Sequence, residues 1–90
     1  MRVLEEVMDH DITELLRGEI NQCIKEERYQ IALDLGGVRI LHSVGIGMLL
    51  SQRKLLVQLG GNLVFTSISS ELESIFKLTG VMRLMEIEKK

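Results

Sequence analysis

The hydrophobic residues of this chain follow two spacings, and the two alternate from one end to the other. Over residues 11–26, 44–59 and 70–79 they return every three or four positions, the spacing that gathers them on one face of an α-helix. Residues 29–35 and 62–66 are short, nearly continuous apolar runs, which are typical of buried strands. The pattern therefore predicts three helices separated by strands.

Three weaker segments are candidates for further short strands: Arg2–Val7, Val38–Leu41 and Leu84–Ile87. Strands joined through helices need crossover connections, and such connections run between parallel strands. The sequence thus predicts a single α/β domain over residues 1–90, with a mixed or mainly parallel sheet of about four to five strands and about three helices. Five apolar positions are expected to be largely buried: Ile31, Leu33, Leu49, Val64 and Phe76.

Polar residues and glycines mark where the predicted helices begin and end. Asp11 and Ser70 each open a sequence that resembles a capping box. Ser43 stands directly before the second helical run, where an N-cap belongs. Gly60–Gly61 and Gly80 follow the second and third runs, as helix stops do.

The segment ahead of the first predicted helix determines the strand at one edge of the predicted sheet. It holds only one short strand candidate, Arg2–Val7, so the sheet is expected to have a shortened edge. An unpaired edge presents backbone N–H and C=O groups to another strand. We expect Arg2–Val7 either to form an edge strand or to pair across the interface of a homodimer.

Composition argues against one class of partner. The chain has 90 residues, of which 46% are hydrophobic, which is enough for one modest core. Its net charge is −2, with 11 basic and 13 acidic residues interspersed, and it has one Tyr, two Phe and no Trp. Without a basic stripe or aromatic stacking platforms, nucleic acid is not an expected partner.

Three features of the sequence favour a cytoplasmic protein. Cys23 is alone, which excludes an internal disulfide and a cysteine-based zinc site, and suits a reducing compartment. No apolar run approaches the roughly 18 residues of a membrane span. The start of the chain carries Glu5, Glu6 and Asp9 in place of the basic and then apolar pattern of a signal peptide. We expect a soluble cytoplasmic protein that does not insert into a membrane.

The most informative segment is Ile40–Leu50, where an apolar extended piece leads through one hydroxyl residue and two glycines into a helix. Ser43 is that hydroxyl residue, and the start of a helix stabilises anions such as a phosphate on it. Gly45 and Gly47 leave the first turn without side-chain bulk, so another protein would be able to approach its backbone closely. Ser43 is therefore either a plain cap or a switch, and the two roles are compatible.

Catalytic and cofactor-binding interpretations of the same segment are weaker. His42 beside Ser43 suggests a nucleophile and its base, but adjacent residues rarely align in that way and a third, orienting group is not evident. The two histidines, His10 and His42, have no local ligand spacing, so no metal site is expected. Gly45 and Gly47 resemble half of a dinucleotide fingerprint, but Leu50 stands at the third glycine position. We expect neither an enzyme nor a cofactor.

Four motifs follow one another in family-like order, at Asp34–Val38, His42–Gly47, Leu59–Val64 and Leu78–Val81. Together they resemble the STAS domain of bacterial anti-sigma factor antagonists. That family has an Asp-Leu-x-x-Val strand end, an Asp-Ser-(Ser/Thr)-Gly turn, a Gly-Gly before the next strand and a late Leu-Thr-Gly. The resemblance covers about residues 9–88.

This resemblance implies a partner-switching role. Members of the family bind an anti-sigma factor that is also a serine kinase, and so release the sigma factor. Phosphorylation of the serine in the turn ends the binding, and a phosphatase restores it. Ser43 matches that phosphoacceptor, and Met48 is expected to be exposed beside it as an adaptable contact. The partner-binding surface is then expected to consist of His42, Ser43, Val44, Gly45, Gly47 and Met48.

One departure from the family pattern bears on the proposed phosphorylation. His42 stands where the family usually has Asp, which removes a negative charge beside Ser43. The alternative is an accessory or scaffold STAS module in a signalling or lipid-transport complex, which uses no serine switch. The neighbouring genes would separate the two, because a kinase-type anti-sigma factor favours the first and transporter subunits favour the second.

Overall fold

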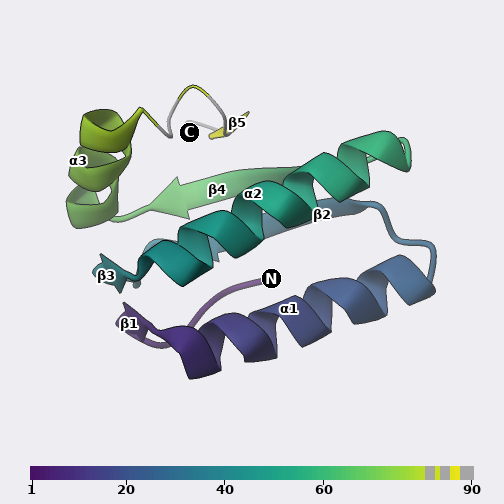
Figure 1. The fold of residues 1–90 in the computed structure, drawn as a ribbon, viewed down its shortest axis with the longest axis horizontal. Helices are drawn as coiled ribbons and strands as arrows, with labels where there is room; N and C mark the ends of the chain where they lie inside the picture. The colour runs from purple at the N-terminus through teal and green to yellow at the C-terminus, as the bar shows by residue number, and fades with distance from the viewer. Residues whose placement is uncertain (81–82, 84–85, 88–90) are drawn as a thin grey trace.

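The computed structural model describes residues 1–80, 83 and 86–87, and it contains the three expected helices. They are α1 (His10–Lys25), α2 (Ser43–Gln58) and α3 (Ser70–Thr79), each within one residue of its predicted bounds. α1 and α2 lie side by side, and α3 stands at one end of the molecule (Figure 1). In the described part of the chain, no helix is both long and apolar enough to cross a membrane.

The strands are short and form two groups. β1 (Val7–Met8) pairs with β3 (Ile40–Leu41), while β2 (Gln30–Leu35), β4 (Asn62–Ile68) and β5 (Glu86–Ile87) form a sheet in the order β2-β4-β5. All of these pairings are parallel. The predicted α/β class with parallel strands is therefore confirmed, although the strands divide between two sheets. Residues 84–85 of the last predicted strand lie outside the described residues.

The N-terminal segment links the two groups of strands. The Asp34 N–H donates to the Met1 carbonyl at 2.8 Å, and the Val3 N–H donates to the Asp34 carbonyl at 3.2 Å. Further on, the Glu6 carbonyl accepts from the backbone of Arg39 at 2.8 Å. The segment thus pairs with β2 at one end and with the start of β3 at the other. Only the two ends of Arg2–Val7 are paired as a strand, through an isolated bridge from Arg2 to Asp34 and through Val7 in β1, so the predicted edge strand is present in part. The homodimer stays a prediction.

The buried apolar residues form one cluster between the helices and the strands. Four of the five residues expected in the core are buried there: Ile31, Leu33, Leu49 and Phe76. Val64 is only half-buried, which corrects the prediction for that position. Side chains alternate between the two faces of a strand, and in β4 it is Leu63 and Phe65 that face the core, each with 0% exposure.

Side-chain caps begin two of the helices, one or two residues ahead of the predicted caps. The Asp9 carboxylate accepts from the Ile12 N–H at 3.0 Å at the start of α1. The Ser69 hydroxyl accepts from the Leu72 N–H at 3.2 Å at the start of α3. Gly80 ends α3 in the left-handed conformation, with φ of 76°, as its position after the helical run predicted.

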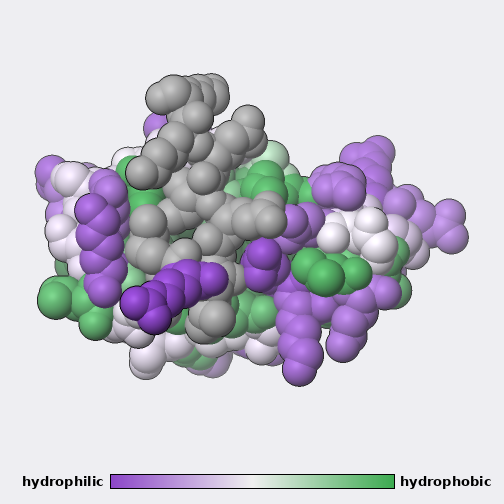
Figure 2. Space-filling view, turned by 90° about the horizontal axis from the view of Figure 1, so that it is seen from above, coloured by the Kyte–Doolittle hydropathy of each residue, from purple (hydrophilic) through white to green (hydrophobic). Residues whose placement is uncertain are grey.

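Hydropathy on the surface follows this arrangement. Seen from above, hydrophobic patches are interspersed among hydrophilic side chains, and hydrophilic side chains project at the end of the molecule away from α3 (Figure 2). The helices begin at the opposite end, and Ser43 lies there as the first residue of α2 (Figure 1).

Candidate functional site

The candidate site lies where three strands end and three helices begin. β1 leads into α1, β3 into α2 and β4 into α3, so the three helix starts gather at one end of the molecule (Figure 1). Parallel strands that are each followed by a helix produce this arrangement, because their carboxyl ends share one edge. Ser43 lies at this end, as the first residue of α2.

The predicted N-cap role of Ser43 is wrong by one residue. His42 occupies the N-cap position, and its side chain makes no capping hydrogen bond. The His42 N–H donates to the Met8 carbonyl at 3.1 Å, so the pairing of β3 with β1 holds the chain extended through His42. The helix therefore starts one residue later than a serine cap requires, and Ser43 falls at its first helical position.

This placement leaves the Ser43 hydroxyl available. Ser43 is exposed, and its side chain takes part in no hydrogen bond with the described residues. Its position in the first turn also places it beside backbone N–H groups that lack partners within the helix. The local geometry thus suits a modified serine, since a phosphate there meets the positive end of the helix dipole.

The remaining predicted contact residues divide into exposed and buried sets. His42, Val44 and Gly47 are exposed beside Ser43. Gly45 and Met48 are buried, and Met48 has only 4% exposure, so the expectations that Gly45 opens the backbone to a partner and that Met48 is exposed are both wrong. The helical repeat explains this division, because positions 45 and 48 lie on the face of α2 that packs onto the protein.

Gly45 serves packing within the chain. A Cβ atom there would lie 2.6 Å from Leu41 Cδ1 and 3.2 Å from Thr13 Oγ1. By contrast, a Cβ atom at Gly47 would have no heavy atom within 4 Å. The first glycine thus lets α2 sit close to α1, and the second leaves space on the outer surface.

The two glycines should therefore respond in opposite ways to alanine. Gly47→Ala should stabilise the protein by about 0.5–1 kcal/mol, because alanine is the better helix former and meets no neighbour. Gly45→Ala should destabilise it by about 1–3 kcal/mol through overpacking. Urea unfolding followed by circular dichroism measures both. Equal shifts for the two variants would contradict the assignment of one glycine to the interior and the other to the surface.

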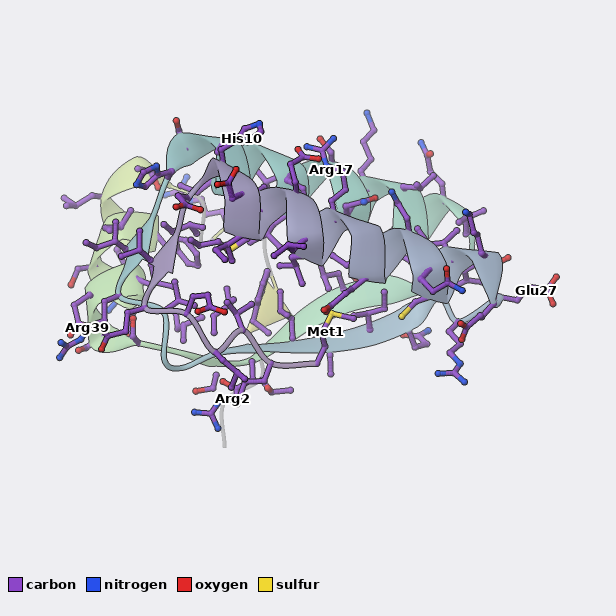
Figure 3. All side chains as sticks on the ribbon, turned by 90° about the horizontal axis from the view of Figure 1, so that it is seen from below. Met1, Arg2, His10, Arg17, Glu27 and Arg39 are labelled. Carbon is purple, nitrogen blue, oxygen red and sulfur yellow. The ribbon has the colours of Figure 1, made fainter. Side chains whose placement is uncertain are left out.

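Sequence reasoning missed the neighbours that α1 brings to the site. The register pairs Met8 with Leu41, so Asp9 and His42 follow at adjacent positions of the two chain segments. His10 lies at the start of α1, where Figure 3 labels it. Its Nδ1 atom is 3.7 Å from Asp11 Oδ1. The start of α1, with the acidic residues Asp9 and Asp11, thus follows β1 at the same edge at which α2 follows β3. Among the described residues, no group of three or more His, Cys, Asp or Glu could hold a metal ion.

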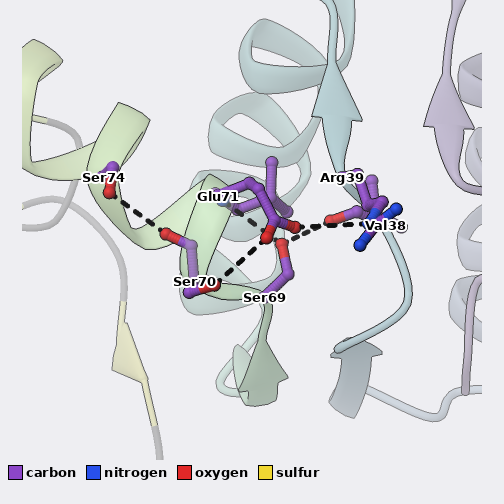
Figure 4. A network of polar contacts seen from close by, with 7 residues as sticks. Val38, Arg39, Ser69, Ser70, Glu71 and Ser74 are labelled. Carbon is purple, nitrogen blue, oxygen red and sulfur yellow. Dashed lines mark hydrogen bonds and ion pairs between the residues drawn. The ribbon is translucent and has the colours of Figure 1, made fainter.

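A second exposed serine gives a useful comparison. Ser70 is the first residue of α3, as Ser43 is of α2, but its hydroxyl donates to the Glu71 carboxylate at 3.1 Å. Glu71 also pairs with Arg39, with 3.6 Å between its carboxylate and Nε, and Ser69 donates to the Val38 carbonyl (Figure 4). These contacts connect the start of α3 to residues 38–39, which directly precede β3. Ser70 is therefore engaged within the protein, whereas the Ser43 hydroxyl is not.

Comparison with known proteins agrees with the fold. Residues 3–90 match the family model described as the STAS domain, and the chain belongs to that family. The chain is also similar to an anti-sigma F factor antagonist of Paenibacillus polymyxa, with 24% identity over 81 residues. That alignment covers 89% of this chain and 69% of the relative.

Proposed function

We propose that this chain is an anti-sigma factor antagonist that binds a kinase-type anti-sigma factor and is switched off by phosphorylation of Ser43. The observation that carries the proposal is the exposed Ser43, with an unengaged hydroxyl, at the first position of α2. Membership of the STAS family and the similarity to an anti-sigma F factor antagonist support it. In this proposal a phosphatase restores binding.

The contact surface consists of the exposed residues of the first turn, which are His42, Ser43, Val44 and Gly47. Gly45 and Met48 are buried and support this surface from beneath. A phosphate on Ser43 adds roughly −1.5 to −2 charges at that surface. The helix start tolerates this charge in the free protein, but a docked partner would have to desolvate it. The switch therefore acts on binding and not on folding.

Phosphorylation itself gives the direct test. On incubation with the kinase-type anti-sigma factor of the same organism and ATP, we expect phosphate on Ser43 and none on Ser70, located by mass spectrometry of peptides. Ser70 is the matched control because it is also exposed and begins a helix. Phosphate on both serines, or on neither, would contradict a switch specific to Ser43.

His42 is the feature that favours the alternative, an accessory STAS module without a switch. The family usually has Asp at this position, and Asp9 and Asp11 lie at the start of the neighbouring helix instead. If a carboxylate near Ser43 helps the kinase, His42→Asp should raise the rate of phosphorylation in the same assay. An unchanged rate would mean that the departure at position 42 is harmless.

A further inference from the structure

A groove of about 570 Å³ opens between α1 and α2, directly beside the turn that carries Ser43. Val44 and Gly47 belong both to this groove and to the exposed first turn of α2. The space above Gly47 is empty to at least 4 Å from a Cβ position, so the groove is open on that side. A partner that covers Ser43 would thus also cover the mouth of the groove.

The lining of the groove is part polar and part apolar, and the one charge among its lining residues is positive. That charge belongs to Arg17, on the side of α1 that faces α2 (Figure 3). Deeper in the groove, Gln52 has 7% exposure and donates from its amide to the Asn21 side chain at 3.0 Å. The lining thus offers hydrogen-bonding groups and a cation, with no carboxylate among them.

Arg17 retains unused hydrogen-bonding capacity. Its Nη2 atom lies 3.3 Å from Glu14 Oε1, while its Nε atom is buried and has no hydrogen-bond partner within the described residues. Because the Nε atom is closed to solvent, the donors that remain for an incoming acceptor are those of the terminal nitrogens of the guanidinium. The contact with Glu14 joins two half-exposed side chains, and such pairs are weak enough to be exchanged for a better one.

We propose that this groove receives an acidic side chain of the bound anti-sigma factor, with Arg17 as its anchor. The inference rests on the proposed function and names a second contact for the same partner. A carboxylate fits because it accepts charge-assisted hydrogen bonds from the terminal nitrogens of the guanidinium, which belong to a side chain that is 43% exposed. Val44, at 37% exposure, adds an apolar rim around the charged contact.

The groove also links the anchor to the switch. Ser43 directly precedes Val44, so a phosphate on Ser43 would stand next to the mouth through which the carboxylate enters. Two like charges placed together at an interface oppose binding. Phosphorylation then lowers affinity by repelling the acidic side chain as well as by covering the surface of the first turn.

Binding of the kinase-type anti-sigma factor to full-length variants, measured by isothermal titration calorimetry, tests the anchor. Arg17→Gln should weaken binding by about ten-fold or more, because the partner's carboxylate loses its only cation in the groove. Glu14→Gln should leave affinity unchanged or raise it, because Glu14 competes for Arg17. Arg28→Gln is the matched control and should bind like the wild type, since Arg28 is exposed beyond the end of α1 and pairs with Glu26 at 3.5 Å.

Gly47→Leu keeps every charge and closes the groove. It should fold, because the space at Gly47 is open, and it should also bind about ten-fold or more weakly. Raising the salt concentration should weaken the wild type more than Arg17→Gln, because only the wild type keeps the charged contact. Melting temperatures close to that of the wild type would show that the losses arise at the interface.

The outcomes separate the two proposals. If the wild type binds, Ser43→Asp does not, and Arg17→Gln binds as the wild type does, the groove proposal is wrong and the proposed function stands. If the wild type does not bind the anti-sigma factor, the proposed function fails and the groove proposal fails with it. A loss that is equal for Arg17→Gln and Arg28→Gln would mean that general charge, and not the groove, sets the affinity.

Discussion

Replacing Ser43 by aspartate should weaken binding to the kinase-type anti-sigma factor by about a hundred-fold or more, because like charges or unpaired charges at an interface cost several kcal/mol. The substitution should leave the fold intact. Ser43 is exposed, and its side chain makes no hydrogen bond with the described residues that the substitution would remove. A carboxylate in the first turn of a helix is itself stabilised by about 0.3–1 kcal/mol. Calorimetric titration and thermal melting measure the two effects separately.

Two controls distinguish a switch from a structural residue. Ser43→Ala should keep full binding and change stability by less than about 0.5 kcal/mol, because Ser43 is not the N-cap of α2. Ser70→Asp places the same charge at the start of α3 and should bind as the wild type does. If Ser43→Asp binds as tightly as Ser43→Ala, Ser43 does not act as a switch.

Replacing Gly61 by alanine should destabilise the protein by about 3 kcal/mol or more, the upper range for overpacking a closely packed site. A Cβ atom at Gly61 would overlap the backbone carbonyl of Tyr29. The next residue, Asn62, is the first residue of β4, and it donates its N–H to that same carbonyl at 2.9 Å, directly before β2 begins at Gln30. The backbone therefore has to move at the point where the two central strands meet.

Gly18→Ala provides the comparison for this second prediction. Gly18 lies inside α1 with no heavy atom within 4 Å of a Cβ position, so alanine there should stabilise by about 0.5–1 kcal/mol. Urea unfolding of both variants gives the difference directly. A Gly61→Ala variant as stable as the wild type would show that the approach of Gly61 to Tyr29 is not as close as the structure has it.

The order and type of the elements were predictable because their signals are local. Apolar residues at helical spacing, short apolar runs and terminal glycines identified three helices within one residue of their bounds and the central strands β2 and β4. The same local reasoning placed Val64 in the core and was wrong there. An apolar run does not show which of its alternating side chains faces the helices, and pairing with β2 decides that.

The sequence by itself determined the fold class, the three helices and the position of Ser43 near a helix start, since all of these follow from residues close together in the chain. Only the tertiary structure decided where α2 begins, because the hydrogen bond from His42 to Met8 joins segments far apart in the sequence. It likewise decided that Gly45 and Met48 are buried while Gly47 stays open, because that depends on which face of α2 packs against α1. The groove with Arg17 has the same origin: its lining comes from two helices that only packing brings together.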